Sequence, residues 1–152
     1  MRNINLTGTT DYNYLFSSCS GTELNLSNWD ISGVTILSSS FYFAGYKKIN
    51  LSGWNTVNVK NMGYTFNYLP NLETLIIPDW DMTNATSTNS FISNVKKLKY
   101  IDLSRSNDFT INKIASMLPS TAGTMVIPSS TSQTAIDAVT AKGWTTTTEP
   151  TQ

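Results

Sequence analysis

Residues 24–35 have the sequence LNLSNWDISGVT, and the same arrangement returns as INLSGWNTVNVK at 49–60 and LIIPDWDMTNAT at 75–86. In each stretch an apolar-x-apolar triplet ends three residues before a tryptophan. Trp29, Trp54 and Trp80 therefore lie 25 and 26 residues apart. Working outward, triplets of the same kind occur at residues 4–6, 101–103 and 125–127. A fixed period of this length is typical of a protein built from stacked repeats.

Each repeat unit is expected to contain a strand, a turn and a short helix. Asp30, Asn55 and Asp81 follow the tryptophans, and side chains of these types accept hydrogen bonds from backbone N–H groups two or three positions later, so they predict a corner. Residues 36–43 and 61–68 carry apolar side chains four positions apart, the spacing of one helical face. Three phenylalanines recur in these segments and are predicted to belong to the core: Phe41, Phe66 and Phe91.

One such unit cannot bury its apolar face alone, but neighbouring units bury it for each other. We therefore predict an α/β repeat solenoid, with a parallel sheet on one face, short helices on the other, and a C-terminal capping helix and strand. In the cap, Ser132–Lys142 has helical spacing and ends before Gly143, and residues 144–148 are rich in Thr and β-prone. The solenoid is expected to span residues 1–148, with coils at about 4–23, 24–48, 49–74, 75–100 and 101–124, a cap at 125–148, and a tail at 149–152.

The composition excludes several classes of function. Ten Lys and Arg balance ten Asp and Glu in the 152 residues, so the chain lacks the positive charge expected of a nucleic-acid binder. The absence of histidine excludes histidine-based zinc sites and Ser-His-Asp or Cys-His catalysis. No apolar stretch approaches the roughly 20 residues of a membrane helix, so membrane insertion is not expected. The single Cys19 cannot form an internal disulfide and is expected to pack as a small hydrophobe.

The repeat resembles that of the BspA-like leucine-rich-repeat family, whose unit is roughly L-x-L-S-x-W/F-D-x-S-x-V-x-x-M-x-x-M-F. Residues 24–35 with the later Phe41 match it, residues 49–66 match as well, and residues 78–85 are a degenerate copy. The resemblance covers about residues 4–128. It implies a leucine-rich-repeat-like fold, a bacterial surface or secreted protein with an adhesive role, or a phage tail or virion protein, and it implies no catalytic residue. Residues 105–109, RSNDF, depart from the pattern, so the fourth corner is expected to be built differently.

The outward positions of the strands are the candidate binding site. In leucine-rich repeats this face is the usual partner surface, and here it would present amides, hydroxyls and isolated charges able to hydrogen-bond a protein or a glycan. An ordinary solvated face, with asparagines that stabilise the stack, is an equally good interpretation. The residues placed on this face by alternation are Glu23, Asn25, Ser27, Lys48, Asn50, Ser52, Thr74, Ile76, Tyr100, Asp102 and Ser104.

Three other features have a functional and a structural interpretation, and the structural one is favoured for each. The tryptophans would suit sugar stacking, but recurrence at one repeat position is better explained by internal packing. Lys96, Lys97 and Lys99 form a cationic cluster, which at this length is usually just solvated. Asp79 and Asp81, on either side of Trp80, could act together as metal ligands, but the repeat uses an Asp at this position to close its corner. The sequence therefore predicts neither a metal nor a cofactor.

The function expected from these patterns is a non-catalytic, surface-exposed binding or adhesion module that recognises a host-cell or neighbouring protein or glycan. We expect an extracellular or cell-surface location and no enzyme activity. The alternative is a structural or receptor-binding component of a bacteriophage virion, since the chain begins with Met1 and lacks a secretion signal. The sequence leaves the ligand and the oligomeric state open.

Overall fold

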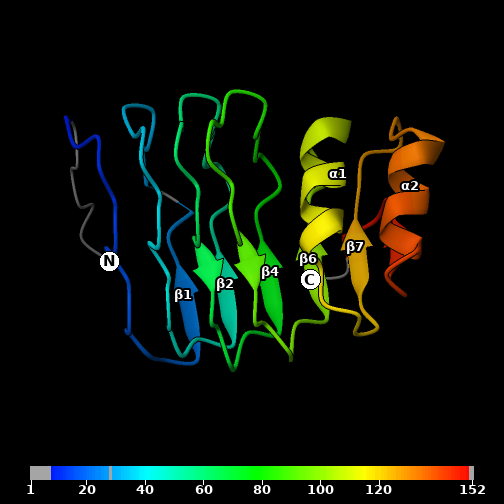
Figure 1. Ribbon diagram of the computed structural model, residues 1–152, viewed down its shortest axis with the longest axis horizontal. Coiled ribbons are helices and arrows are strands. Elements are labelled where there is room, and N and C mark those ends of the chain that lie inside the picture. The colour runs from blue at the N-terminus through cyan, green and yellow to red at the C-terminus, as the bar shows by residue number, and fades with distance from the viewer. Residues whose placement is uncertain (1–7, 28, 151–152) are drawn as a thin grey trace.

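A sheet of six parallel strands forms one face of the protein, as the computed structural model of residues 8–27 and 29–150 shows (Figure 1). In spatial order its strands are β1 (Glu23–Asn25), β2 (Lys48–Asn50), β4 (Thr74–Ile76), β6 (Tyr100–Asp102), β7 (Thr124–Val126) and β8 (Thr145–Thr147). The apolar centres of the triplets pair in register from Leu24 through Ile49, Leu75 and Ile101 to Met125. The predicted parallel sheet is therefore confirmed, while the triplet at residues 4–6 lies outside the described residues.

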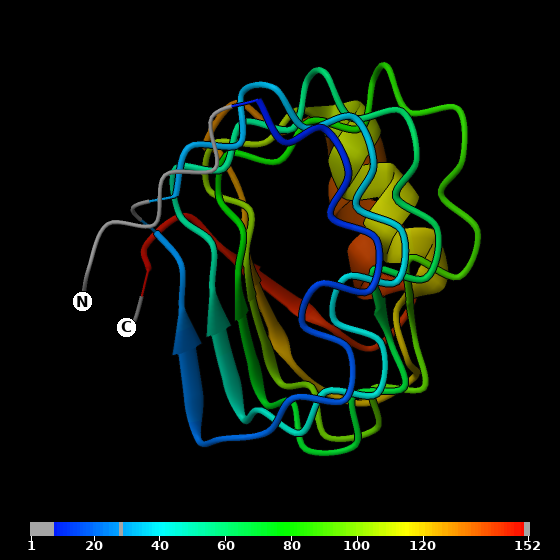
Figure 2. The same cartoon turned by 90° about the vertical axis from the view of Figure 1, so that its left-hand side faces the viewer.

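The chain returns to each new strand along the opposite side of the molecule (Figure 2). There isolated parallel bridges link Asp11 with Ile36, Ile36 with Asn61, and Asn61 with Ser87. A short parallel pair of β3 (Phe66–Asn67) with β5 (Ile92–Ser93) lies beside them. The last two returns contain the helices α1 (Asp108–Met117) and α2 (Gln133–Thr140), which pack against each other. The apolar core lies between the sheet and these returns.

The predicted helices at residues 36–43 and 61–68 are wrong. These segments are bent chains in which Ser39, Phe43, Tyr64 and Tyr68 have left-handed backbone, with φ between 56° and 61°. A run of α-helix cannot include such residues, because it needs right-handed φ at every position. The backbone N–H groups here donate instead to the next coil, as Phe41 does to the carbonyl of Thr65 at 3.1 Å.

The recurring aromatic side chains fill the core, as expected. Phe41, Phe66 and Phe91 have no exposed surface, and the ring centroids of successive phenylalanines lie 5.2 Å apart. Trp54 and Trp80 are equally buried, so their faces are not available to a sugar. Burial of a large apolar side chain contributes about 1.5–3 kcal/mol, so each added coil stabilises its neighbours.

The corner after each tryptophan closes as predicted. The side-chain oxygen of Asp30 accepts a hydrogen bond from the backbone N–H of Ser32 at 2.9 Å, and Asp81 does the same for Thr83 at 2.8 Å. Asn55 accepts from Val57 in the same way. These bonds satisfy backbone groups at the point where the chain leaves the sheet, so the residue type at this position is explained by local structure.

The C-terminal elements agree with the expected helix and strand. Helix α2 begins after Ser132, whose hydroxyl accepts from the backbone N–H of Ala135, and Gly143 beyond its end has a φ of +81°. Strand β8 lies within residues 144–148 and pairs with β7. The prediction for Cys19 is wrong, because it is exposed. Its equivalent one coil later, Ala44, is fully buried, since coils cover that position from both sides.

Candidate functional site

The structure brings the candidate residues of the strand face into two rows across the sheet. Glu23, Lys48, Thr74 and Tyr100 are paired in register in one row, and Asn25, Asn50, Ile76 and Asp102 in the other. The Lys48 Nζ lies 3.7 Å from a carboxylate oxygen of Glu23, so charges on neighbouring coils meet across the face. Ser27, Ser52 and Ser104 follow at the ends of the strands.

Only part of this face is accessible to a partner. Glu23 and Asn25 are exposed, and Lys48, Asn50 and Thr74 are half-buried. Ile76, Tyr100 and Asp102 are at most 9% exposed, so they offer little contact area. Alternation along a strand gives the direction of a side chain, whereas exposure also depends on the strands on either side, which lie only about 4.8 Å away.

The polar side chains at the strand ends have a structural role. The Oδ1 atoms of Asn25, Asn50 and Asp102 accept hydrogen bonds from the backbone N–H two residues later, at 3.1, 3.0 and 2.9 Å. Each therefore closes the turn that leads out of its own strand. Their recurrence is explained by turn formation, so a test of binding on this face has to use other positions.

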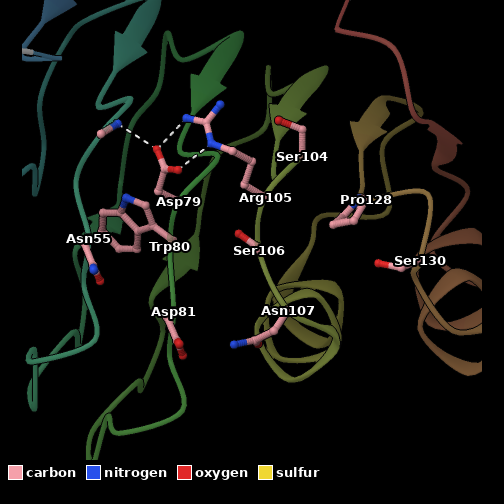
Figure 3. A pocket seen from close by; sticks show the side chains of 11 residues that line it. Asn55, Asp79, Trp80, Asp81, Ser104, Arg105, Ser106, Asn107, Pro128 and Ser130 are labelled. Carbon is pink, nitrogen blue, oxygen red and sulfur yellow. Dashed lines mark hydrogen bonds and ion pairs between the residues drawn. The ribbon is translucent and has the colours of Figure 1, made fainter.

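An open pocket with a volume of about 660 Å³ lies at the corners where the chain leaves four neighbouring strands, β2, β4, β6 and β7 (Figure 3). Arg105 reaches back one coil to Asp79 and donates through Nε and, at 2.7 Å, through Nη2. Asp79 also accepts from the backbone N–H of Gly53 at 2.8 Å. The pocket is lined by Gly53, Asn55, Asp79, Trp80, Asp81, Ser104, Arg105, Ser106, Asn107, Pro128 and Ser130.

Hydrogen bonds lower the pKa of both carboxylates of the pocket, which favours their ionised form. Hydrogen bonds from the Arg105 side chain lower the pKa of Asp79, and the hydrogen bond from the Gly53 N–H lowers it further. Together they outweigh the partial burial of Asp79, which acts to raise its pKa. Burial acts to raise the pKa of Asp81, but hydrogen bonds from Thr83 and Asn107 outweigh it, and the net shift is downward. Ionised carboxylates accept hydrogen bonds rather than donate protons, so this arrangement suits binding of hydrogen-bond donors.

Sequence reasoning found part of this pocket. It singled out Asp79 and Asp81, and it expected a different fourth corner, where the structure has Asn107 as the N-cap of α1. It did not find the pocket itself. The available signal was the 26-residue separation of Asp79 and Arg105, which is one repeat and places them on adjacent coils.

The lysine cluster is solvated. Lys96, Lys97 and Lys99 are exposed, and the Lys97 Nζ donates to the Asn71 side chain at 3.1 Å. Within residues 8–27 and 29–150, no three His, Cys, Asp or Glu side chains gather as metal ligands would. The same residues contain no helix with the length and apolar character needed to cross a membrane.

Comparison with known proteins places most of the chain in one family. No curated protein and no solved structure matches it. A family model described as "Mycoplasma protein of unknown function, DUF285" matches residues 3–126. The match ends at the last residue of strand β7. The matched region thus contains the tryptophan repeats, the strand face and most of the corner pocket. On this match the chain belongs to the DUF285 family.

Proposed function

We propose that the protein is a non-catalytic binding module with a BspA-like leucine-rich-repeat solenoid, which recognises a macromolecular partner through its strand face at a cell surface. The observation that carries this proposal is the in-register sheet, which places equivalent residues of successive coils on one continuous face. Membership of DUF285 and the repeat pattern of residues 24–35 support the BspA-like assignment.

The accessible part of the strand face suits a partner with mixed polar character. Glu23, Lys48 and Thr74 present a carboxylate, an ammonium group and a hydroxyl on three adjacent strands. Charged and polar groups in such a row give specificity, because a partner must match their order to avoid leaving a desolvated charge unpaired. The neutral chain as a whole does not attract partners by long-range charge, so recognition depends on these local contacts.

The proposal is tested first by a binding screen of the purified chain against arrays of glycans and cell-surface proteins. For a partner found there, Thr74→Lys places a second cation beside Lys48 in the centre of the accessible rows. Because Thr74 is half-buried and closes no turn, the variant should fold and weaken binding at least tenfold. Thr134→Lys makes the same chemical change on the exposed side of α2 and is the matched control. Equal affinity of Thr74→Lys and wild type would contradict the assignment of the site.

A further inference from the structure

A second surface of the protein carries exposed aromatic rings that the core does not use. Tyr14, Phe43, Tyr64 and Tyr68 lie on the return segments, opposite the sheet, and are between 45% and 57% exposed. The rings of Phe43 and Tyr68 are stacked, with centroids 5.7 Å apart and an interplanar angle of 20°. Tyr42 contacts both of them, at 5.8 and 6.1 Å. We name Tyr14, Tyr42, Phe43, Tyr64 and Tyr68 the aromatic return face.

The backbone under these rings is unfavourable for an aromatic residue. Tyr14, Phe43, Tyr64 and Tyr68 all have φ between 57° and 61°, a conformation that bulky L-residues rarely adopt. The equivalent position one coil after Tyr68 is Asn94, with φ of 56°, and Asn is among the residues that tolerate this backbone best. The fold therefore accepts a small polar side chain here, and the aromatic rings are not required by the backbone.

The return segments that carry the rings contain no charged residue, although Lys97 reaches Asn71 at the end of one of them. Residues 12–22, 31–46, 61–72 and 82–95, which form the returns of the first coils, contain no Asp, Glu, Lys or Arg. Their polar groups are amides and hydroxyls: the Oδ1 of the buried Asn67 accepts from Ser93 at 3.0 Å and from Asn94 at 3.2 Å. A face without charge does not complement an ionic partner, and it can be covered without desolvating a charge.

We propose that the aromatic return face binds neutral polysaccharides. Flat exposed rings contact the apolar C–H face of a pyranose, while neighbouring amides and hydroxyls exchange hydrogen bonds with its equatorial hydroxyls. The exposed ring surfaces that Phe43 and Tyr68 do not use for stacking on each other are the platform, and the exposed rings of Tyr14 and Tyr64 on the same returns offer additional contacts. Backbone that is unfavourable for its side chain and an exposed apolar patch are both features that concentrate at binding surfaces. This site is separate from the strand face, and neither proposal depends on the other.

The test is affinity electrophoresis of the full chain in gels that contain soluble xylan, galactomannan or β-glucan, together with pull-down on cellulose and chitin. The decisive variant is Phe43→Asn with Tyr68→Asn, which installs the residue already found at position 94. It should reduce binding at least tenfold and leave the melting temperature within about 5 °C, because lost ring contacts are offset by relieved backbone strain. The control is Phe109→Asn, which removes an equally exposed ring at the start of α1 and should leave binding unchanged.

Several outcomes would overturn the proposal. They are the absence of retardation by any of these neutral polymers, equal retardation of the double Asn variant and wild type, or retention of wild type only by anionic hyaluronan or by phosphatidylcholine vesicles. Thr74→Lys should bind the polysaccharides as wild type does. A loss of polysaccharide binding in that variant would also contradict the proposal, since it would move the site to the strand face.

Discussion

Substitution of Phe66 by Ala tests whether the stacked coils hold one another in place. Phe66 is fully buried, and its ring lies 5.2 Å from the rings of both Phe41 and Phe91 and 5.4 Å from Trp80. The side chain therefore joins three successive coils. Phe16 occupies the equivalent position in the first described coil, where it is only partly buried and contacts Phe41 and Trp29.

The expected cost follows from these contacts. Truncation of a buried phenylalanine to alanine removes about 3–5 kcal/mol, which already includes the cavity left behind. Phe66 has ring contacts to three aromatic neighbours, each worth about 0.5–1.5 kcal/mol, so its cost should lie at the upper end of that range. A domain of this size is typically stable by about 5–15 kcal/mol, so the variant should remain folded in buffer. Phe16→Ala should cost about half as much, because less surface leaves water when that residue packs.

Urea unfolding followed by tryptophan fluorescence measures both variants, since Trp54 and Trp80 report on the core around Phe66. The expected result is a much lower midpoint for Phe66→Ala than for Phe16→Ala, with similar slopes. If Phe66→Ala cost no more than Phe16→Ala, the coils would not depend on each other through this column. If it is too unstable to purify, Phe66→Leu keeps most of the volume and should cost about 1.5 kcal/mol or less.

Three further predictions concern polar groups. The pKa of Asp79 is lowered in the folded protein by hydrogen bonds from Arg105, so the unfolded chain binds more protons and stability is lost as pH falls through the folded pKa, below about pH 4. Asp79→Asn should flatten the fall of the melting temperature over that range, and a curve parallel to wild type would refute this. The fully buried Thr65 Oγ1 lies 3.0 Å from the Leu37 carbonyl and 2.8 Å from that of Met62, so Thr65→Val should cost about 1–3 kcal/mol in urea unfolding, whereas Thr65→Ser should cost less. Asn107 caps α1 by accepting from the Thr110 N–H at 2.8 Å, so Asn107→Ala should lower stability by about 1 kcal/mol; an equal loss with Asn107→Ser, which keeps a capping oxygen, would exclude capping as the cause.

The sheet could be predicted from the sequence because its signal is repeated. The triplets recur at a nearly constant period, and three of them have the same spacing to a tryptophan, so the parallel register follows from the period. The corner residues Asp30, Asn55 and Asp81 follow from side-chain chemistry. The returns could not be predicted in the same way. Phe41 lies four residues after Leu37, which suggested one helical face, but two left-handed residues in each bent return bring both side chains into the core instead.

The candidate sites were predicted less well, because they depend on contacts between coils. Asp79 and Arg105 lie 26 residues apart in the sequence, so no pattern within one segment predicts their pairing. The low exposure of Tyr100 and Asp102 is set by neighbouring strands. The exposed rings of Phe43 and Tyr68 had no distinguishing sequence signal, since buried aromatics such as Phe41 and Phe66 stand only two residues before them. In this chain, periodicity separates repeat positions but does not tell an inward ring from an outward one.

The order of the strands in the sheet also makes resistance to local opening differ from one strand to the next. Ile49 and Trp54 are fully buried, because neighbouring coils cover them from both sides. Their equivalents one coil earlier, Leu24 and Trp29, remain partly accessible to water. Of the described strands, β1 carries side chains that are less covered than those of β4, so its amide protons should exchange with solvent sooner. Glu23 and Asn25, the most accessible members of the strand face, thus lie on the described strand that we expect to open most readily.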